Sequence, residues 1–410
     1  MSRATSSAEE ELLRVRVTGP LEPFVVGFAA ELARQGFAPS SAVAHLRLTA
    51  RVSRWLEDER LAPAALFAET AERFCEARRA AGYTKFVSMR GLGPLLGYLR
   101  REGVIPLEGT SSRLGPVEAL LDRFGRYLKG ECGLAPTSVD RYAATVRPFV
   151  EQLNGRDGIE LTRLNAEEVR GFVLAYCPRR GSSVAKLTVV ALRALLCFLY
   201  LQGEIESPLA DAVPSVASWR LAELPKRLEL GEVQRLLDSC DRSTASGRRD
   251  LAILTVLARL GMRVCEVAAL SLGDVDWQAG EITLRGKGRS ERLPLPVDVG
   301  QATVAYLRDG RPANTMSTAL FVCLLAPYGA MSRTAVSGVV ARASGRAGLG
   351  SIYGHRLRHT AASEMLMAGA DLREIGQVLG HRSVDSTAIY AKCDRRSLRE
   401  IARPWPGALS

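Results

Sequence analysis

The stretch "GHRLRHTAASEMLMAGADLREIGQVLGHRSVDSTAIYAK", from Gly354 to Lys392, holds three of the four histidines in a chain of 410 residues. His355 and Arg358 are three residues apart, so a helix would place both side chains on one face. A guanidinium beside an imidazole can bind a phosphate and exchange a proton near neutral pH. The pattern therefore indicates a phosphate site, although "HRLRH" alone also fits an ordinary basic surface helix.

The second half of this stretch predicts a short helix followed by two further polar residues. Asp371 is a suitable N-cap, apolar residues follow at helical spacing, and Gly380 can end the helix. His381 comes directly after that glycine, and Tyr390 lies nine residues later. Most tyrosines pack in protein cores, so Tyr390 by itself carries no functional signal.

Upstream of this stretch, "ARLGMRVCEVAALSL" contains one isolated pair of charges. Arg263 and Glu266 are the only charged residues between Met262 and Leu272. A guanidinium buried in such a segment needs a charged partner or a bound anion. Glu266, three residues further on, is placed to orient Arg263, and a purely structural Arg–Glu pair is the alternative.

The segment "EITLRGKGRSERLPLP", residues 281–296, changes the apolar period from helical spacing to two. This pattern predicts a β-hairpin or the turn of a small three-stranded sheet, with Lys287 between two glycines at the tip. Before it, "RLELGEVQRLLDSC" and the residues from Arg249 to Leu260 have helical spacing, and Gly261 ends the second helix. A mostly helical domain with one small sheet is expected.

Two segments of the first half resemble each other. "GFAPSS" at 36–41 corresponds to "GLAPTS" at 133–138, and "YLRREGVI" at 98–105 corresponds to "FLYLQGEI" at 198–205. The offset changes only from 97 to 100, which is typical of a duplicated helical domain, although helical layouts can also coincide by chance. Each copy is interpreted as a bundle of four or five helices.

Composition limits the class of protein. The formal net charge is +11, and the sequence pI is about 9.5, which favours a polyanionic partner without proving one. The longest apolar run, Val189 to Leu201, contains Arg193 and is shorter than the roughly 18 residues of a membrane span. With no secretory h-region and eight scattered cysteines, we expect a cytoplasmic protein with no membrane segment, disulfide framework or metal site.

Four ordered blocks of the third domain resemble the tyrosine recombinases of the phage-integrase type, between about Leu228 and Lys392. They are "GMRVCEVAAL" with Arg263, "GKGRSERLPLP" with Lys287, "HRLRHTAASEML" with His355 and Arg358, and "LGHRSVDSTAIYAK" with His381 and Tyr390. Cys265 and Ala361 stand where the family commonly has Ser and Phe. These two differences leave the resemblance intact.

The resemblance implies strand cleavage without a metal or other cofactor. Tyr390 would attack a DNA phosphate and form a 3′-phosphotyrosine, while Arg263 and Arg358 hold the non-bridging oxygens. Cations near the phenol would favour its ionised form, since the ordinary tyrosine pKa is about 10.

The remaining residues of the motif would move protons or support the site. Lys287 would protonate the leaving 5′-oxygen, His355 would accept the proton of the tyrosine hydroxyl, and His381 would donate a hydrogen bond to the phosphate. Glu266 would position Arg263 without contacting the phosphate itself, and His359 is expected only to pack or cap.

The resemblance also implies a domain plan, which is mainly α with two SAM-like helical bundles before the mixed catalytic domain. We expect a flexible N-terminus at 1–19, an extra helical domain at 20–112, a core DNA-binding domain at 113–210, a linker at 211–226, a catalytic domain at 227–393 and a C-terminal helix and tail at 394–410. In the core DNA-binding domain, Arg141, Lys186 and Arg193 are candidate phosphate contacts. The extra domain is typical of transposon-encoded members.

The expected partner is double-stranded DNA with paired recombination sites, bound by a homotetramer that exchanges C-terminal tails. Trp405 would pack on a neighbouring protomer, and packing on its own chain is the alternative. Moving or resolving a mobile element is the expected role, alone or with partner recombinases. Two alternatives stay open: a DNA-binding accessory homologue, and a type IB topoisomerase, which would relax supercoils as a monomer.

Overall fold

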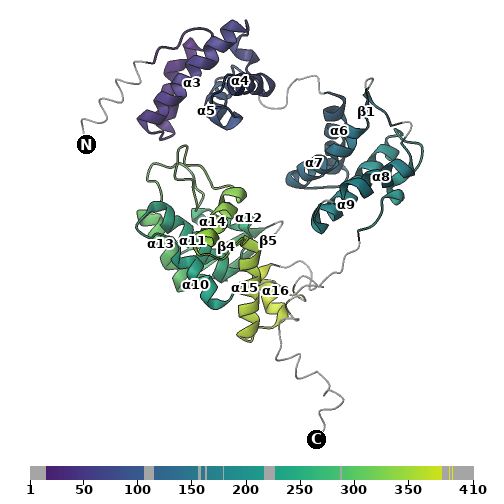
Figure 1. Ribbon diagram of the computed structural model, residues 1–410. Helices are drawn as coiled ribbons and strands as arrows, with labels where there is room; N and C mark the ends of the chain where they lie inside the picture. Colours follow the sequence, from purple (N-terminus) through teal and green to yellow (C-terminus); the bar gives the residue numbers. More distant parts are fainter. Residues whose placement is uncertain are drawn as a thin grey trace. The chain divides into compact units, whose positions relative to one another are not determined.

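The computed structural model describes residues 15–105, 115–155, 158–161, 164–178, 180–216, 227–286 and 289–380, together with Thr387 and Tyr390. These residues contain three large hydrophobic cores and a small fourth one around Tyr390. The three units built on the large cores are each treated by themselves, and Figure 1 labels their helices and strands. The predicted mainly helical fold with small antiparallel sheets is confirmed.

The first core belongs to a four-helix unit with two short 3-10 turns. Phe28 on α2, Leu46 and Val52 on α3, and Leu99 on α5 are almost completely buried in it. The elements are η1 (Glu22–Phe24), α2 (Val25–Arg34), α3 (Pro39–Asp58), η2 (Pro63–Ala65), α4 (Ala68–Ala80) and α5 (Met89–Arg101).

The second unit repeats this helix order. Its elements are α6 (Pro116–Gly130), α7 (Pro136–Gln152), β1 (Asn154–Gly155), β2 (Gly158–Ile159), α8 (Ala166–Tyr176), α9 (Ser182–Leu201) and η3 (Leu209–Ala212). A proline at N1 begins both α3 and α7, where its missing N–H costs nothing. After the last helix of each unit, Gly103 and Gly203 have φ of 69° and 71°. The matching layout supports a duplication, and the β1–β2 hairpin is an addition that the sequence pattern did not predict.

Among the helices that the structure describes, α9 is the one with the length and apolar composition of a membrane span. Nine of its residues are buried, and all of these except Thr188 form part of the second core, among them Leu192, Leu195 and Leu199. Such burial is that of a core helix. Val213 is 1% exposed in the same core, so packed chain continues past the expected domain boundary at 210.

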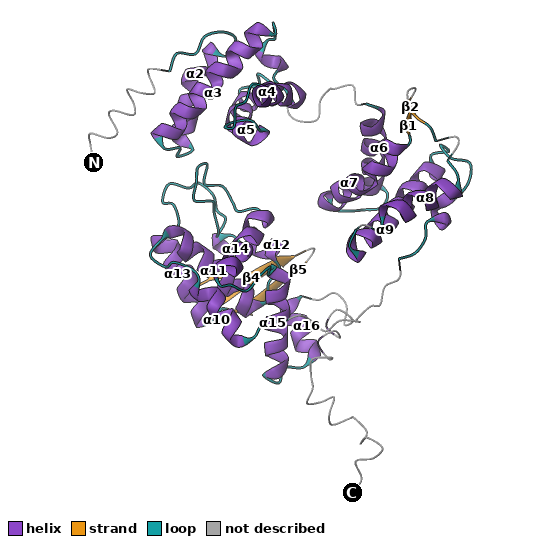
Figure 2. Ribbon diagram, in the orientation of Figure 1, coloured by secondary structure: helices purple, strands orange, loops and turns teal. Residues whose placement is uncertain are grey.

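The third unit is a helical layer around one small sheet, which Figure 2 shows in orange. Strands β3 (Val275–Asp276), β4 (Glu281–Gly286) and β5 (Arg289–Pro294) are antiparallel in the order β3-β4-β5, with Ile282 opposite Leu293. Of the two arrangements that the sequence predicts, a β-hairpin or part of a small three-stranded sheet, the structure has the second. The other elements are α10 (Leu230–Asp238), α11 (Ala245–Leu260), α12 (Val264–Ala269), η4 (Leu272–Asp274), α13 (Val297–Asp309), α14 (Arg333–Arg346), α15 (Gly354–Met367) and α16 (Leu372–Leu379).

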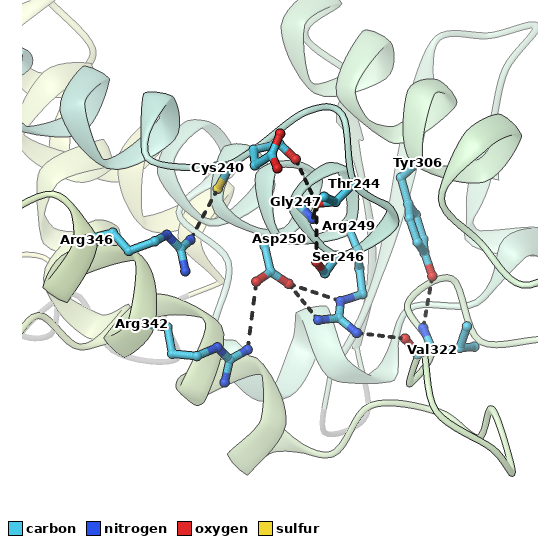
Figure 3. Close-up of polar contacts among 11 residues, drawn as sticks. Cys240, Thr244, Ser246, Gly247, Arg249, Asp250, Tyr306, Val322, Arg342 and Arg346 are labelled. Carbon is cyan, nitrogen blue, oxygen red and sulfur yellow. Dashed lines mark hydrogen bonds and ion pairs between the residues drawn. The ribbon is translucent and has the colours of Figure 1, made fainter. Parts of the chain in front are cut away.

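Helix α11 runs through the middle of this unit, and a buried polar cluster fixes its first half (Figure 3). The Nη2 and Nε atoms of Arg249 donate to Asp250 Oδ1 at 2.8 and 3.1 Å. Arg249 also donates to the Val322 carbonyl at 3.4 Å, and Arg342 of α14 lies 3.8 Å from the other Asp250 oxygen. Because two cations surround the buried carboxylate, α11 is tied to its neighbours before it reaches Gly261.

Candidate active site

Arg263 sits where α11 gives way to α12. Gly261 has φ of 60°, a left-handed conformation that ends α11 and turns the chain. Glu266 accepts hydrogen bonds from the Arg263 backbone N–H at 2.7 Å and from its Nη1 at 2.6 Å, and Nη2 donates to the Gly380 carbonyl at 3.3 Å. Glu266 is thus in hydrogen-bond contact with Arg263, but the expected burial of Arg263 is wrong: its side chain is 42% exposed, because it lies at a helix start rather than in the core.

Arg358 of α15 is the buried arginine of the site. It is 2% exposed, and its Nη1 donates to the Gly261 carbonyl at 2.8 Å while Nη2 donates to the Leu379 carbonyl. Desolvation, followed by repulsion from Arg263, lowers the pKa of Arg358 to about 10. The guanidinium stays charged at neutral pH and joins the ends of α11 and α16.

In the structure, the histidine that contacts the Tyr390 hydroxyl is His359. Its Nδ1 lies 2.9 Å from the Tyr390 hydroxyl oxygen. Tyr390 is 1% exposed and packs against Ala362, Ile375 and Leu379. The His355 and His359 rings are 4.3 Å apart between centroids. Sequence reasoning gave His359 only packing or capping, although its spacing of four from His355 places both on one helix face.

Electrostatics keeps His359 neutral. Desolvation, and then the proximity of His355 and Arg358, lower its pKa to about 4. Desolvation, Arg358 and Arg263 also lower the pKa of His355. A neutral imidazole ring has one nitrogen that accepts, and in the tautomer with its proton on Nε2 it is Nδ1 of His359 that accepts the hydrogen of the Tyr390 hydroxyl.

Two of the six expected catalytic residues, Lys287 and His381, lie outside the described residues. Their neighbours are described: Gly286 and Arg289 pair at the end of the β4–β5 ladder, and Gly380, with φ of 65°, ends α16. The capping box of α16, in which Asp371 accepts from the Glu374 N–H, is as the sequence predicts.

The three candidate DNA contacts lie in the second unit. Arg141 is exposed on α7, whereas Lys186 and Arg193 on α9 are partly buried. Arg193 Nη2 donates to the Val213 carbonyl at 2.8 Å, which gives this side chain a structural contact at the end of its own unit. Among the described residues, no group of three or more His, Cys, Asp or Glu side chains is arranged to hold a metal ion.

Two family models match the second and third units. The family model "Phage integrase family" matches residues 226–396, and "Phage integrase, N-terminal SAM-like domain" matches residues 121–203. Tyrosine recombinase XerD of Mycobacterium tuberculosis (strain H37Rv) is 34% identical over 304 residues, which cover 69% of this chain and 94% of XerD. The chain belongs to the phage integrase family. It is a tyrosine recombinase, an enzyme of site-specific DNA recombination.

Relatives of this recombinase include one that extends through the extra first unit. The Sinorhizobium fredii protein with the printed name "Putative integrase/recombinase y4rA" is 38% identical over 393 residues, 95% of each chain. Among solved structures, XerH bound to its palindromic difH substrate has a TM-score of 0.57 at 20% identity, covering 72% of this recombinase and 97% of that chain. A lambda integrase tetramer bound to a Holliday junction has a TM-score of 0.52 at 15% identity, covering 75% and 87%. At these identities the two structures share the fold.

Proposed function

We propose that Tyr390 is the nucleophile with which this recombinase cuts and rejoins DNA. The observation that carries the proposal is the meeting of the Tyr390 hydroxyl with His359 on α15, the helix that also supplies His355 and Arg358. The tyrosine oxygen forms a bond to the scissile phosphorus, and the bond from phosphorus to the 5′-oxygen breaks. The product is a 3′-phosphotyrosine with a free 5′-hydroxyl, so rejoining is the same step in reverse.

Arg263 and Arg358 hold the non-bridging oxygens and stabilise the charge of the pentavalent transition state. Both guanidinium groups are oriented beforehand by hydrogen bonds, from Arg263 to Glu266 and from Arg358 to the Gly261 carbonyl. An arginine fixed in this way needs little reorganisation when the phosphate arrives.

Proton movement is assigned to the histidines and the lysine. The proton of the Tyr390 hydroxyl passes to His359, whose Nδ1 is in hydrogen-bond contact with that hydroxyl. The His355 ring lies beside the His359 ring. A phosphate between the arginines would offset the positive charges that lower the pKa of His359, and so make the ring more basic when it is needed. Lys287 protonates the leaving 5′-oxygen, and His381 donates a hydrogen bond to the phosphate.

The biological role proposed is the movement or resolution of a mobile element in the cytoplasm. The recombinase would bind paired sites on double-stranded DNA as a homotetramer with exchanged C-terminal tails, alone or with partner recombinases. The DNA-bound lambda integrase tetramer among the solved structures supports this assembly by analogy. Arg141 and Lys186 remain the proposed DNA contacts of the second unit.

The test is covalent trapping of DNA in cells. Cells expressing wild type, Tyr390→Phe or Tyr306→Phe are lysed in denaturant, and DNA attached to the protein is recovered and its ends are sequenced. Tyr306 is a matched control, since its buried hydroxyl contacts the Val322 N–H in the same unit. DNA joined through a 3′ end at a discrete site, present in wild type and Tyr306→Phe and missing in Tyr390→Phe, is expected. Equal recovery from all three proteins would contradict the assignment, and relaxation of plasmid with a single site by a monomer would favour a topoisomerase.

A further inference from the structure

The first helical unit carries a row of exposed arginines that strand cleavage does not use. Arg47, Arg51 and Arg54, here called the α3 arginine face, are all exposed. Their spacing of four and three residues places them along one side of α3. Like charges at this spacing repel one another, so the row destabilises the helix unless an anion lies against it.

Two further residues extend this face. Tyr83, which is 51% exposed, has the Arg78 guanidinium carbon 4.1 Å from its ring centroid and that of Arg51 at 5.9 Å. Arg78 is only 6% exposed, and its Nη2 donates to the Lys85 carbonyl at 3.1 Å. Its Nε is buried with no hydrogen-bond partner among the described residues. Desolvation, and then the charge of Arg51, lower the pKa of Arg78.

Among the described residues, carboxylates form ion pairs with other arginines of the same unit but not with those of the α3 arginine face. Arg34 and Arg101 both pair with Glu31, and Arg73 pairs with Glu59 at 2.8 Å. In contrast, the part of the chain that the structure describes contains no ion pair to any residue of the α3 arginine face or to Arg78. The charges of the α3 arginine face are therefore not neutralised by a carboxylate in direct contact.

The second unit, which has the same helix order, does not share this feature. With the offset of 97, the α3 arginine face corresponds to Ala144, Pro148 and Glu151 on α7. The two units have the same helix order and different surface chemistry on the matching helix. The arginines are thus a property of the first unit and not of the helical scaffold.

We propose that the α3 arginine face, with Arg78 and Tyr83, is a separate binding site for the phosphate backbone of duplex DNA. The seven helical steps from Arg47 to Arg54 span roughly 10 Å, which matches the axial rise of about three base pairs. A guanidinium group can donate two parallel hydrogen bonds to phosphate oxygens, and both Arg51 and Arg78 lie near the Tyr83 ring. This site goes beyond cleavage, because binding here uses neither Tyr390 nor the residues around it.

The test measures binding of the full-length chain to a fluorescent duplex of random sequence over a range of salt concentrations. Such binding depends on phosphate contacts, so no recombination site is needed. The variant is Arg47→Ala/Arg51→Ala/Arg54→Ala, and the matched control is Arg34→Ala/Arg73→Ala/Arg101→Ala. The control loses the same charge from arginines that carboxylates already neutralise. Circular dichroism checks the fold of both, and the single variant Arg51→Glu provides a second measurement if either triple variant unfolds.

The expected result is a fall in the salt slope of log K by roughly 2.7 in the first variant, since each lost phosphate contact removes about 0.9. Arg51→Glu should lower duplex affinity, and the control variant should retain the wild-type slope within about one contact. Equal slopes in the two triple variants would overturn the proposal. Loss of binding to single-stranded RNA or anionic vesicles, with duplex binding unchanged, would also overturn it.

Covalent trapping separates this inference from the proposed chemistry. Tyr390→Phe should bind the random duplex as wild type does while it traps no DNA. The Arg47→Ala/Arg51→Ala/Arg54→Ala variant should keep the ability to form the covalent complex at high protein concentration. If wild type traps no DNA but the salt slopes differ as expected, the proposed nucleophile fails and the binding site stands.

Discussion

The hydrogen bond between His359 and Tyr390 can be tested by a double-mutant cycle. His359→Phe keeps a ring of similar size and removes the acceptor that lies 2.9 Å from the tyrosine oxygen. Tyr390→Phe removes only the hydroxyl. If the contact stabilises the end of the catalytic unit, the effects of the two substitutions on stability are not additive, because either substitution alone already removes the hydrogen bond.

The size of the effect follows from burial. Tyr390 is 1% exposed, and loss of a partner for a buried polar group costs about 1 to 3 kcal/mol. In the protein that retains Tyr390, we expect His359→Phe to lower the free energy of local opening around α15 by this amount. In the Tyr390→Phe background it should cost less than about 0.5 kcal/mol.

Hydrogen exchange of α15 amides, measured by mass spectrometry on the full chain, gives these opening free energies. Cleavage of the trapped DNA site, measured as the rate of covalent complex formation, gives the catalytic effect. His359→Phe should slow cleavage by about 10²- to 10⁴-fold, as expected for loss of a proton acceptor. His359→Asn should be less impaired, since its side-chain oxygen can take the place of Nδ1.

Two results would refute this reasoning. One is a coupling energy between the two substitutions below about 0.5 kcal/mol, which is the usual error for independent sites. The other is equal cleavage by His359→Phe and His359→Asn, which would show that the Nδ1 acceptor has no part in the reaction. A fluorinated tyrosine at position 390, which ionises more readily, should restore cleavage to His359→Phe only if His359 accepts the proton.

Two further predictions concern the turn after α11 and the pH dependence of stability. Gly261→Ala should lower the free energy of unfolding by roughly 2 to 4 kcal/mol, since a Cβ would lie 2.7 Å from Leu379 Cδ2 at φ of 60°. Gly348→Ala, at φ of 67° with no atom within 4 Å, should lose only about 1 to 2 kcal/mol in chemical denaturation, and equal losses would contradict the steric argument. Because the pKa of His359 falls from 6.5 when unfolded to about 4 when folded, protection of α15 in hydrogen exchange should decrease as the pH is lowered from about 6.5 to about 4. His359→Asn should flatten this dependence, whereas His45→Asn, which changes a half-buried histidine of the first unit whose pKa is also lowered by desolvation, should leave it unchanged in α15.

Much of the site could be predicted from the sequence because its signals are local. Capping at Asp371, the ends of helices at Gly261 and Gly380, and the alternation around Lys287 depend on residues within a few positions of one another. Local steric and hydrogen-bonding rules fix such features. The order of the four catalytic blocks then indicated the family, which the comparisons confirm.

The incorrect predictions concern features that depend on burial or on a partner far away in the sequence. Arg263 lies among apolar residues in sequence but is exposed at the start of α12, whereas Arg358 lies in a basic run and is 2% exposed. Apolar neighbours along the chain do not report which side of a helix faces the core. The burial of each arginine depends on how α11, α15 and α16 pack together.

The sequence by itself determined the helical units, the small sheet and the identities of the residues around the proposed scissile phosphate. Only the tertiary structure decided that His359 meets Tyr390, 31 residues further along the chain, and that Arg51 and Arg78 share the Tyr83 ring. The physical reason is that helix caps and strand alternation are set by neighbours in the chain. Contacts between side chains on different helices are set by the packing of buried apolar surfaces, which brings distant residues together.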